Sequence, residues 1–596
     1  MSSGEWSLAA VHDVLAATVP DREMVVCGSV RRTFGEVAER TRSIAAFLGA
    51  CGLGVRRERS DLERWENGQD AVAVVLHNSV EYVEAMLGAF RARAVPFNVN
   101  QHYRPAEVGV LLTDLATRAV VYHRALGPLV AAACETAPGG DLSGLVLVDV
   151  EDGSGVAPLP GSTAFEDAAR TPVGAPLPAP SPDDLYLVCT GGTTGRPKAV
   201  LWRQADIYVS AMAGRADATA ETIAATAAAG GGSWYAVPPL MHAAAQWTAF
   251  SGLHYGATVV LHDDSRPFDA RHVLAVAERE QVALMSIVGD AYARPLVDEL
   301  RRRHYDLGSL RTLGTGGAAT GEPLKEALLE VLPQLTIVDG YGASETGGMA
   351  FGARSRDARP DGFTPGAGAD VVSEDRSRFL APGDDEIGWT ARRGRVPLGY
   401  LGDAERTGAT FPVIDGERVA IPGDRAQRLA DGSIRMLGRD AMVVNTGGEK
   451  VFVEEVEAVL RRHPDVADAL AVGRPSERFG QEVVAVVAPR DGAALDPGDL
   501  REFVAADIAR FKAPRAVAVC DAVRRHANGK ADYRWAQQVA LAAVDATGGR
   551  HDAAIDATGR AGSPDATGGR ADASPDTTGG RPHVTPDATR DASGGR

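Results

Sequence analysis

The most informative local pattern is a run of glycine and threonine at positions 190–198, which reads TGGTTGRPK. It directly follows LYLVC (185–189), an apolar run that is typical of a buried strand. Glycines let backbone N–H groups approach a bulky anion, threonines add hydroxyl donors, and Lys198 adds a positive charge. The Gly-Lys-Ser/Thr ending of a Walker A loop is missing. The run therefore predicts a polyphosphate-binding loop, with a flexible surface turn as the alternative.

Further short motifs follow this loop along the chain. They are PPLMH (238–242), GGA (316–318), DGYGASET (339–346), PGD (422–424), LGRD (437–440), NTGGEKV (445–451) and NGKADY (528–533). In type and order they resemble the adenylate-forming superfamily, which contains acyl-CoA synthetases, luciferases and nonribosomal adenylation domains. The resemblance covers roughly residues 30–541. The stretches WENGQD (65–70) and VPFNVNQHY (95–103) make the chain most similar to fatty-acyl-CoA synthetases of the actinobacterial type.

The resemblance implies an ATP site. Its nucleotide-binding residues are Thr190, Gly191, Gly192, Thr193, Thr194, Gly195, Lys198, Gly317, Asp339, Gly340, Tyr341, Gly342, Ser344, Asp424 and Arg439. Thr193 and Glu345 are implied to hold Mg²⁺, and Asp424 to accept hydrogen bonds from both ribose hydroxyls. Elementary chemistry agrees, because an aromatic ring such as Tyr341 can stack on a purine and a carboxylate can hold Mg²⁺ against phosphate oxygens. Taken alone, the 339–346 motif also fits a strand-end turn with a solvated glutamate.

The resemblance also implies the groups that handle the acid. Lys530 would bridge the carboxylate and the α-phosphate, and His242 would gate the carboxylate pocket. A lysine or histidine taken alone is more often solvated or packed than functional. With Glu345 and Thr193 these two residues form the implied catalytic set. The implied acyl pocket consists of Met241, His242, Trp247, Gly316, Gly317 and Ala318.

A change of domain orientation is implied between two half-reactions. Asp440, in LGRD, is the implied hinge, and the preceding Arg439 would reach the ribose. Gly447, Gly448 and Lys450 belong to a glycine loop that is implied to meet the thiol channel of coenzyme A.

The elements that must position these residues alternate between strands and helices. Strand-like runs such as 335–340 end in glycine-rich loops, and a helical pattern such as 323–332 lies between them. We therefore expect an α/β fold, with a large N-terminal domain of sheets flanked by helices and a small mobile α+β C-terminal domain. The expected boundaries are 1–438 for the large domain and 439–541 for the small one, with the hinge at 440.

Three segments depart from this pattern or qualify it. Residues 542–596 repeat DATGGR-like units and contain almost no large apolar side chains, so we expect a disordered tail. Residues 55–70 are highly charged and are expected to form a surface insertion. Glu454, Glu455 and Glu457 are expected to lie on a solvated face of the first helix of the small domain.

Composition excludes several classes of protein. The chain has 596 residues and a net charge of −17, which argues against a general nucleic-acid binder. The five cysteines form no CxxC pair, which excludes a disulfide scaffold and a zinc–cysteine site and suits a reducing cytoplasm. No run of about 18 apolar residues predicts a spanning helix. We expect a cytoplasmic protein whose partners are small molecules, and we allow a homodimer.

The resulting functional hypothesis is an ATP-dependent acyl-CoA synthetase, an AMP-forming acid–thiol ligase with ATP, Mg²⁺ and coenzyme A as its cofactors and co-substrates. Small residues near the implied pocket favour a medium or long fatty acid or a steroid side-chain acid, although alanine is common throughout the chain. One alternative is a ligase that loads the adenylate onto a carrier protein in trans. The other is a catalytically silent ATP-binding homologue.

Overall fold

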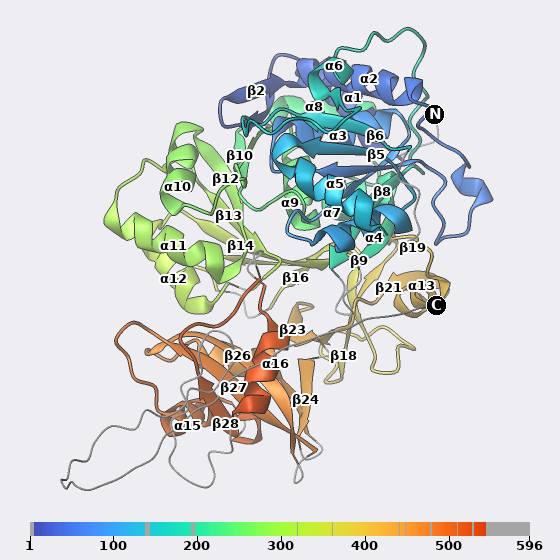
Figure 1. Cartoon of the computed structure of the whole chain (residues 1–596). Helices are drawn as coiled ribbons and strands as arrows, with labels where there is room; N and C mark the ends of the chain where they lie inside the picture. Colours follow the sequence, from blue (N-terminus) through green and yellow to red (C-terminus); the bar gives the residue numbers. More distant parts are fainter. Residues whose placement is uncertain are drawn as a thin grey trace, which may run out of the picture.

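The computed structural model describes residues 5–137, 144–191, 197–318, 320–359, 362–439, 442–446, 449–476, 480–508, 510–526 and 530–543. These residues form a large domain and a smaller C-terminal domain, coloured blue to yellow and orange to red in Figure 1. The predicted α/β class with two domains of unequal size is thus confirmed. The expected boundaries at 438 and 541 stay predictions, and the tail from residue 544 lies outside the described residues.

The first sheet of the large domain carries the glycine-rich loop. Its strands, in spatial order, are β19 (Gly399–Tyr400), β9 (Pro197–Arg203), β8 (Leu185–Gly191), β4 (Val95–Asn98), β3 (Ala71–Val75), β5 (Thr117–His123), β6 (Val146–Val150) and β7 (Thr163–Ala164). The strands from β8 to β7 run parallel and are covered on both faces, which explains near-continuous apolar runs such as AVAVV in β3. β9 returns antiparallel to β8 as a hairpin.

The second sheet carries the glycine and aromatic motifs. Its strands, in spatial order, are β16 (Thr364–Pro365), β15 (Gly347–Arg354), β14 (Thr336–Ala343), β13 (Thr312–Gly316), β12 (Val282–Ile287), β10 (Ser233–Ala236), β11 (Thr258–Leu261), β1 (Glu23–Cys27) and β2 (Val30–Thr33). The strands from β14 to β1 are parallel, so their carboxyl ends meet at one edge. That edge faces the end of β8, as the site geometry below shows.

Helices cover both sheets and meet them in three large apolar cores. They are α1 (Leu8–Thr18), α2 (Phe34–Ala50), α3 (Val80–Arg91), α4 (Pro105–Asp114), α5 (Gly127–Thr136), α6 (Phe165–Ala168), α7 (Gln204–Ala211), α8 (Ala220–Ala229), α9 (Ala243–His254), α10 (Ala270–Arg279), α11 (Gly289–Arg302) and α12 (Glu322–Val331). The pattern at 323–332 predicted α12 to within one residue.

A third, smaller sheet closes the large domain towards the C-terminus. It contains β17 (Ala369–Val372), β18 (Ile387–Arg393), β20 (Val413–Ile414), β21 (Glu417–Ala420), β22 (Asp424–Arg428) and β23 (Ile434–Arg439), with α13 (Ala404–Thr410) beside it. The charged segment 55–70 lies at the surface of the first sheet. It contains the short 3₁₀ turn Arg59–Asp61 and is closed by a bridge between Val55 and Gln69.

The small domain has its own sheet. Its strands are β24 (Val443–Thr446), β25 (Glu449–Phe452), β26 (Val466–Ser476), β27 (Gly480–Pro489) and β28 (Ala516–Val519), and its helices are α14 (Val453–Leu460), α15 (Pro497–Asp507) and α16 (Tyr533–Ala542). Apolar clusters on the two faces of this sheet are separate from the cores of the large domain. The small domain can therefore keep its core if its orientation changes.

One expectation about the small domain is wrong. Glu457 was expected on a solvated helix face, but it is buried, with 2% of its surface exposed. Its carboxylate accepts hydrogen bonds from the Ala471 N–H at 2.9 Å and from Arg461 at 2.8 Å. A buried carboxylate is tolerated when it has such partners, and the partners come from sequence positions that helical spacing alone does not identify.

Candidate active site

The glycine-rich loop connects the two strands of the β8–β9 hairpin. Thr190 lies opposite Lys198, and Gly191 lies opposite Pro197. The predicted residues Gly192, Thr193, Thr194 and Gly195 lie outside the described residues, and for Gly191 only the backbone is described. The structure thus places both ends of the loop where an apolar strand leaves the sheet. The Nζ atom of Lys198 lies 5.8 Å from the centre of the Tyr400 ring.

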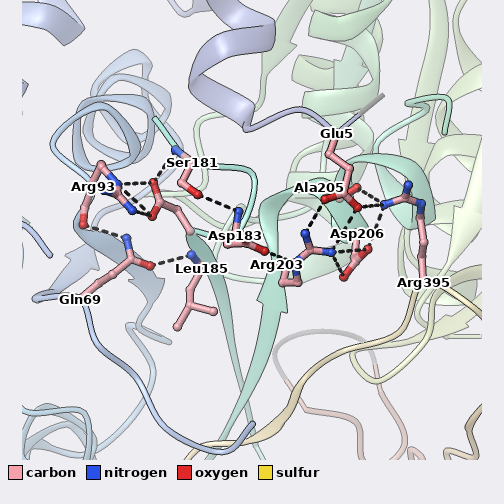
Figure 2. A network of polar contacts seen from close by, with 11 residues as sticks. Glu5, Gln69, Arg93, Ser181, Asp183, Leu185, Arg203, Ala205, Asp206 and Arg395 are labelled. Carbon is pink, nitrogen blue, oxygen red and sulfur yellow. Dashed lines mark hydrogen bonds and ion pairs between the residues drawn. The ribbon is translucent and has the colours of Figure 1, made fainter. Parts of the chain in front are cut away.

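Charged pairs hold the opposite end of this hairpin (Figure 2). Arg203, the last residue of β9, donates to Asp183 at 2.6 Å and to Glu5 at 2.6 Å. Arg93 donates to both carboxylate oxygens of Asp184, just before β8, at 3.0 and 3.1 Å. The hairpin is therefore anchored at its base, the end away from the glycine-rich loop.

Asn98 ties the hairpin to the PPLMH segment. Its side chain accepts from the Cys189 N–H at 2.9 Å and donates to the Cys189 carbonyl at 3.0 Å. The same amide group donates to the Met241 carbonyl at 2.6 Å. Asn98 is buried, and it joins the residue before Thr190 to the residue before His242. Sequence reasoning quoted the stretch around Asn98 only for its family resemblance and missed this contact.

Glu345 is linked to Lys198 through Tyr400. The Tyr400 hydroxyl donates to Glu345 Oε1 at 2.7 Å. Burial and the nearby carboxylate raise the pKa of Tyr400, so it stays a neutral phenol that can donate. The indole of Trp202 donates to the Ser344 carbonyl at 2.8 Å and holds this turn against β9. Tyr400 was missed from the sequence, and its only local signal is the GYLGD turn at 399–403.

A close approach of two strands explains the predicted glycines. Gly316 at the end of β13 pairs with Gly340 of β14. A Cβ atom on Gly316 would lie 2.9 Å from the Gly340 carbonyl oxygen, which is too close. Gly317 has a φ of +76°, a backbone conformation that favours glycine. The predicted pocket residue Ala318 follows, partly exposed, in the same turn.

Tyr341 and Asp424 come together from two different sheets. The Tyr341 hydroxyl donates to Asp424 Oδ2 at 2.5 Å and lies 3.1 Å from the Thr390 hydroxyl. Asp424 is also the register partner of Arg439 across β22 and β23. The structure thus gathers the implied adenine and ribose residues, although the side chain of Arg439 is outside the description. The contact between Tyr341 and Asp424 was not predicted, because it depends on how the two sheets pack.

Asp339 has a partner that the motif did not indicate. Lys325 of α12 donates to Asp339 Oδ2 at 2.5 Å and to Glu322 at 2.9 Å. Burial raises the pKa of Asp339, and the Lys325 ammonium opposes that shift. Gly342 lies in the same strand, β14. The charge of the Asp339 carboxylate is therefore already balanced by the Lys325 ammonium.

His242 caps the start of α9 beside the end of the hairpin. Burial, the ammonium of Lys530 and His102 lower the pKa of His242 to about 4. Its buried Nε2 atom has no hydrogen-bond partner among the described residues. Met241 directly precedes His242, and Trp247 lies about one turn further along in α9. Both side chains are buried. At neutral pH His242 is therefore an uncharged imidazole at the place predicted for a gate.

Lys530 reaches this region from the small domain. Its backbone carbonyl accepts from the His526 N–H at 2.8 Å, and the backbones of Arg525 and Ala531 pair in an antiparallel β-bridge. Lys530 therefore lies on one limb of a narrow hairpin. Lys530 is exposed as a residue, and its positive charge lowers the pKa of the His242 imidazole. Asp440, Gly447 and Gly448 lie outside the described residues, and of Lys450 only the backbone in β25 is described. Their implied hinge and coenzyme A roles stay predictions.

Comparison with known families now decides the affiliation. Residues 13–388 match the family model described as AMP-binding enzyme, and residues 455–530 match the one described as AMP-binding enzyme C-terminal domain. The chain belongs to the AMP-binding enzyme family. The predicted affiliation with adenylate-forming enzymes is thereby confirmed, and the second match falls on the small domain that carries Lys530.

Individual proteins similar to this chain also belong among acid–CoA ligases. It is 45% identical to the medium-chain acyl-CoA ligase Mig of Mycobacterium avium, over 90% of this chain and 98% of that protein. It is 37% identical to a medium/long-chain-fatty-acid–CoA/3-oxocholest-4-en-26-oate–CoA ligase of Mycolicibacterium smegmatis, over 87% and 94% of the two chains. The fold resembles an anthranilate CoA ligase, AuaEII, with a TM-score of 0.73 at 20% identity over 90% and 98%.

The AMP-binding enzyme is an acid–thiol ligase, an AMP-forming acyl-CoA synthetase, as its motifs predicted. The five cysteines all carry free thiols. Among the described helices, none combines the length and the apolar character needed to cross a membrane.

Proposed function

We propose that this enzyme activates a medium-chain, long-chain or steroid side-chain carboxylic acid with ATP and transfers it to coenzyme A. The observation that supports this proposal is that the charge of Lys530 acts on the half-buried His242 imidazole. Asn98 joins the β8–β9 hairpin to the residue before His242, and Tyr400 orients Glu345. A cation from the small domain thus approaches the predicted carboxylate gate. The relatives' names supply the class of acid.

In the first half-reaction, an oxygen of the acid forms a bond to the α-phosphorus of ATP, and pyrophosphate leaves. Two anions must approach each other, so positive charge and positioning dominate catalysis. Lys530 would neutralise the carboxylate and the α-phosphate, and Lys198 with the loop that begins at Thr190 would hold the departing phosphates. Tyr341, Asp424 and Arg439 would hold the nucleoside.

The described part of this site fits a magnesium ion that would be bound jointly by the protein and by the phosphates of ATP. Glu345 presents a carboxylate whose Oε1 is oriented by Tyr400, and hard oxygen ligands suit Mg²⁺. No cluster of three or more His, Cys, Asp or Glu side chains among the described residues could hold a metal by itself. Thr193 is the other proposed ligand. When bound, the ion would neutralise phosphate charge.

In the second half-reaction, the sulfur of coenzyme A bonds to the acyl carbon, the bond from that carbon to AMP breaks, and the thiol proton passes to solvent. Lys530 is no longer needed for this step. We propose that the small domain turns about Asp440 and brings Gly447, Gly448 and Lys450 to the thiol channel. The separate core of the small domain supports such a movement.

The cellular setting is also a proposal. Free thiols in all five cysteines suit a reducing cytoplasm, where we place the reaction. Acid, ATP and coenzyme A are the proposed partners, and a homodimer stays a prediction that size measurements in solution would check.

A panel of carboxylic acids scored by pyrophosphate release tests the proposed function. We expect medium- or long-chain fatty acids, or a steroid side-chain acid, to give the highest kcat/KM. When coenzyme A is added, we expect release of free AMP and an acyl-CoA. Adenylate that is trapped by hydroxylamine but never transferred to coenzyme A would favour a carrier-protein acceptor. Absence of ATP–pyrophosphate exchange with every acid would favour the silent homologue.

A further inference from the structure

A hydrogen bond crosses from the large domain to the small one at helix α11. Arg294 donates from Nη2 to the Ala467 carbonyl in β26 at 3.1 Å. Arg294 is partly buried, although it lies only two turns before the exposed Arg301 on the same helix. In Figure 1 the small domain lies below the green helices α11 and α12. This contact therefore depends on the orientation that the small domain has in this structure.

Asp290, in the first turn of the same helix, is bonded within the large domain, and its charge also acts on the small one. Its Oδ1 atom accepts from the Gly321 N–H at 2.7 Å, in the segment that follows the Gly316 turn. Its negative charge also acts on Arg461 of the small domain. Burial by itself would lower the pKa of Arg461, but the carboxylates of Glu457, Asp468 and Asp290 together hold that pKa above its ordinary value.

Arg461 is the centre of a polar network inside the small domain. It donates to Glu457 at 2.8 Å, to the Ala469 carbonyl at 2.8 Å and to Asp468 at 3.3 Å. Asp468 in turn receives two hydrogen bonds from Arg525, at 2.8 and 2.9 Å. Paired guanidinium–carboxylate contacts of this kind fix orientation as well as distance.

The same network holds both limbs of the hairpin that carries Lys530. Arg525 belongs to the first limb, and its backbone forms a β-bridge with Ala531 of the second limb. Tyr533, directly after the second limb, donates to Glu457 at 3.2 Å. A chain of contacts therefore runs from Arg294 of α11 to Ala467, and from the adjacent Asp468 to Arg525 in the hairpin that carries Lys530.

We propose that Arg294 and Asp290 form a latch with Ala467 and Arg461 that holds the small domain in the orientation for adenylate formation. These four are positioning residues, because they act through the hairpin and touch no reacting atom. The latch has few contacts across the boundary, so it can open for the thioester step. This inference rests on the proposed function and adds to it a control of domain orientation.

The test is Arg294→Ala, assayed separately in the two half-reactions. We expect ATP–pyrophosphate exchange to fall about tenfold, the effect of losing one charge-assisted hydrogen bond. Thioester formation from a supplied acyl-adenylate should stay within about twofold of the wild type, because the latch is open in that step. Arg294→Lys should recover part of the exchange rate, since a lysine can also donate to a carbonyl.

Two further variants separate the latch from a loss of folding. Asp290→Asn removes the charge that faces Arg461 but keeps an oxygen for Gly321, and it should lower exchange in the same selective way. Arg301→Ala is the matched control, because Arg301 lies on the same helix but pairs with Glu330 at the surface, 3.4 Å away. It should change neither half-reaction.

A selective fall in exchange for both latch variants supports the proposal. An equal fall in both half-reactions, no fall in either, or the same fall in Arg301→Ala would overturn it. The proposed function fails differently: wild-type protein would then show no exchange with any acid in the panel.

Discussion

At the scale of single residues, the Tyr400 hydroxyl determines how Glu345 is held. Tyr400→Phe removes the donor at 2.7 Å and leaves the ring that packs against Lys198. A hydrogen bond to a charged group contributes about 1.5–3 kcal/mol, so we expect kcat/KM for adenylation to fall roughly tenfold to hundredfold. We also expect the magnesium concentration needed for half-maximal exchange to rise. Magnesium titrations of pyrophosphate exchange measure this.

The matched control is Tyr305→Phe, because the Tyr305 hydroxyl also donates to a glutamate, Glu299, at 2.7 Å, and neither residue belongs to the candidate active site. It should leave the magnesium dependence unchanged. Equal behaviour of the two variants would contradict the role given to Tyr400.

The pH dependence of stability can be assigned partly to His242. Its pKa is about 4 in the folded protein and near 6.5 in an unfolded chain, so the unfolded state binds more protons between these values. This contribution to stability is complete above pH 6.5 and is lost as the pH falls towards 4. We expect His242→Gln to lose less Tm than the wild type between pH 7 and pH 5.

His304→Gln replaces an exposed histidine and should follow the wild-type pH profile in the same melting experiment. If His242→Gln also followed that profile, the neutral state of the half-buried His242 would be contradicted.

At the scale of elements, Asn98 joins β4, β8 and the start of α9. Asn98→Ala leaves an N–H and two carbonyl groups without their partner in a buried place, at Cys189 and Met241. We expect unfolding to become easier by about 2–4 kcal/mol, and the KM for ATP to rise because the hairpin and the gate lose their common anchor. Urea unfolding and initial rates measure the two effects.

Asn100→Ala serves as the control for this prediction. Asn100 lies in the same stretch, but its side chain accepts from the N–H of the exposed His102 at 2.9 Å, a contact within one short turn. A stability loss as large as that of Asn98→Ala would show that the whole stretch, and not the anchor, is responsible.

Local patterns predicted the elements well and the contacts between them poorly. The apolar run before Thr190 and the helical spacing at 323–332 are local, so they gave β8 and α12 directly. The contacts of Asn98, Tyr400 and Glu457 join positions 14 to 143 residues apart. Such contacts depend on strand order and sheet packing, which no local spacing encodes.

At the scale of the whole molecule, we propose that the reaction is divided between the two domains. The large domain holds the β8–β9 hairpin, Glu345 and His242, and the small domain supplies Lys530. Because the small domain has its own core, its orientation can change without unfolding. The account therefore predicts that removing the Lys530 ammonium harms one half-reaction and not the other.

The most direct test is to measure both half-reactions of Lys530→Ala, with Lys512→Ala as the control. Lys512 is a lysine of the same domain whose ammonium is paired with Glu455, and it is not among the groups that shift the pKa of His242. Loss of a positioned charge at the reacting oxygens should lower ATP–pyrophosphate exchange by roughly a hundredfold or more. The account predicts that thioester formation from a supplied acyl-adenylate continues near the wild-type rate, and an equal loss of both half-reactions would contradict it.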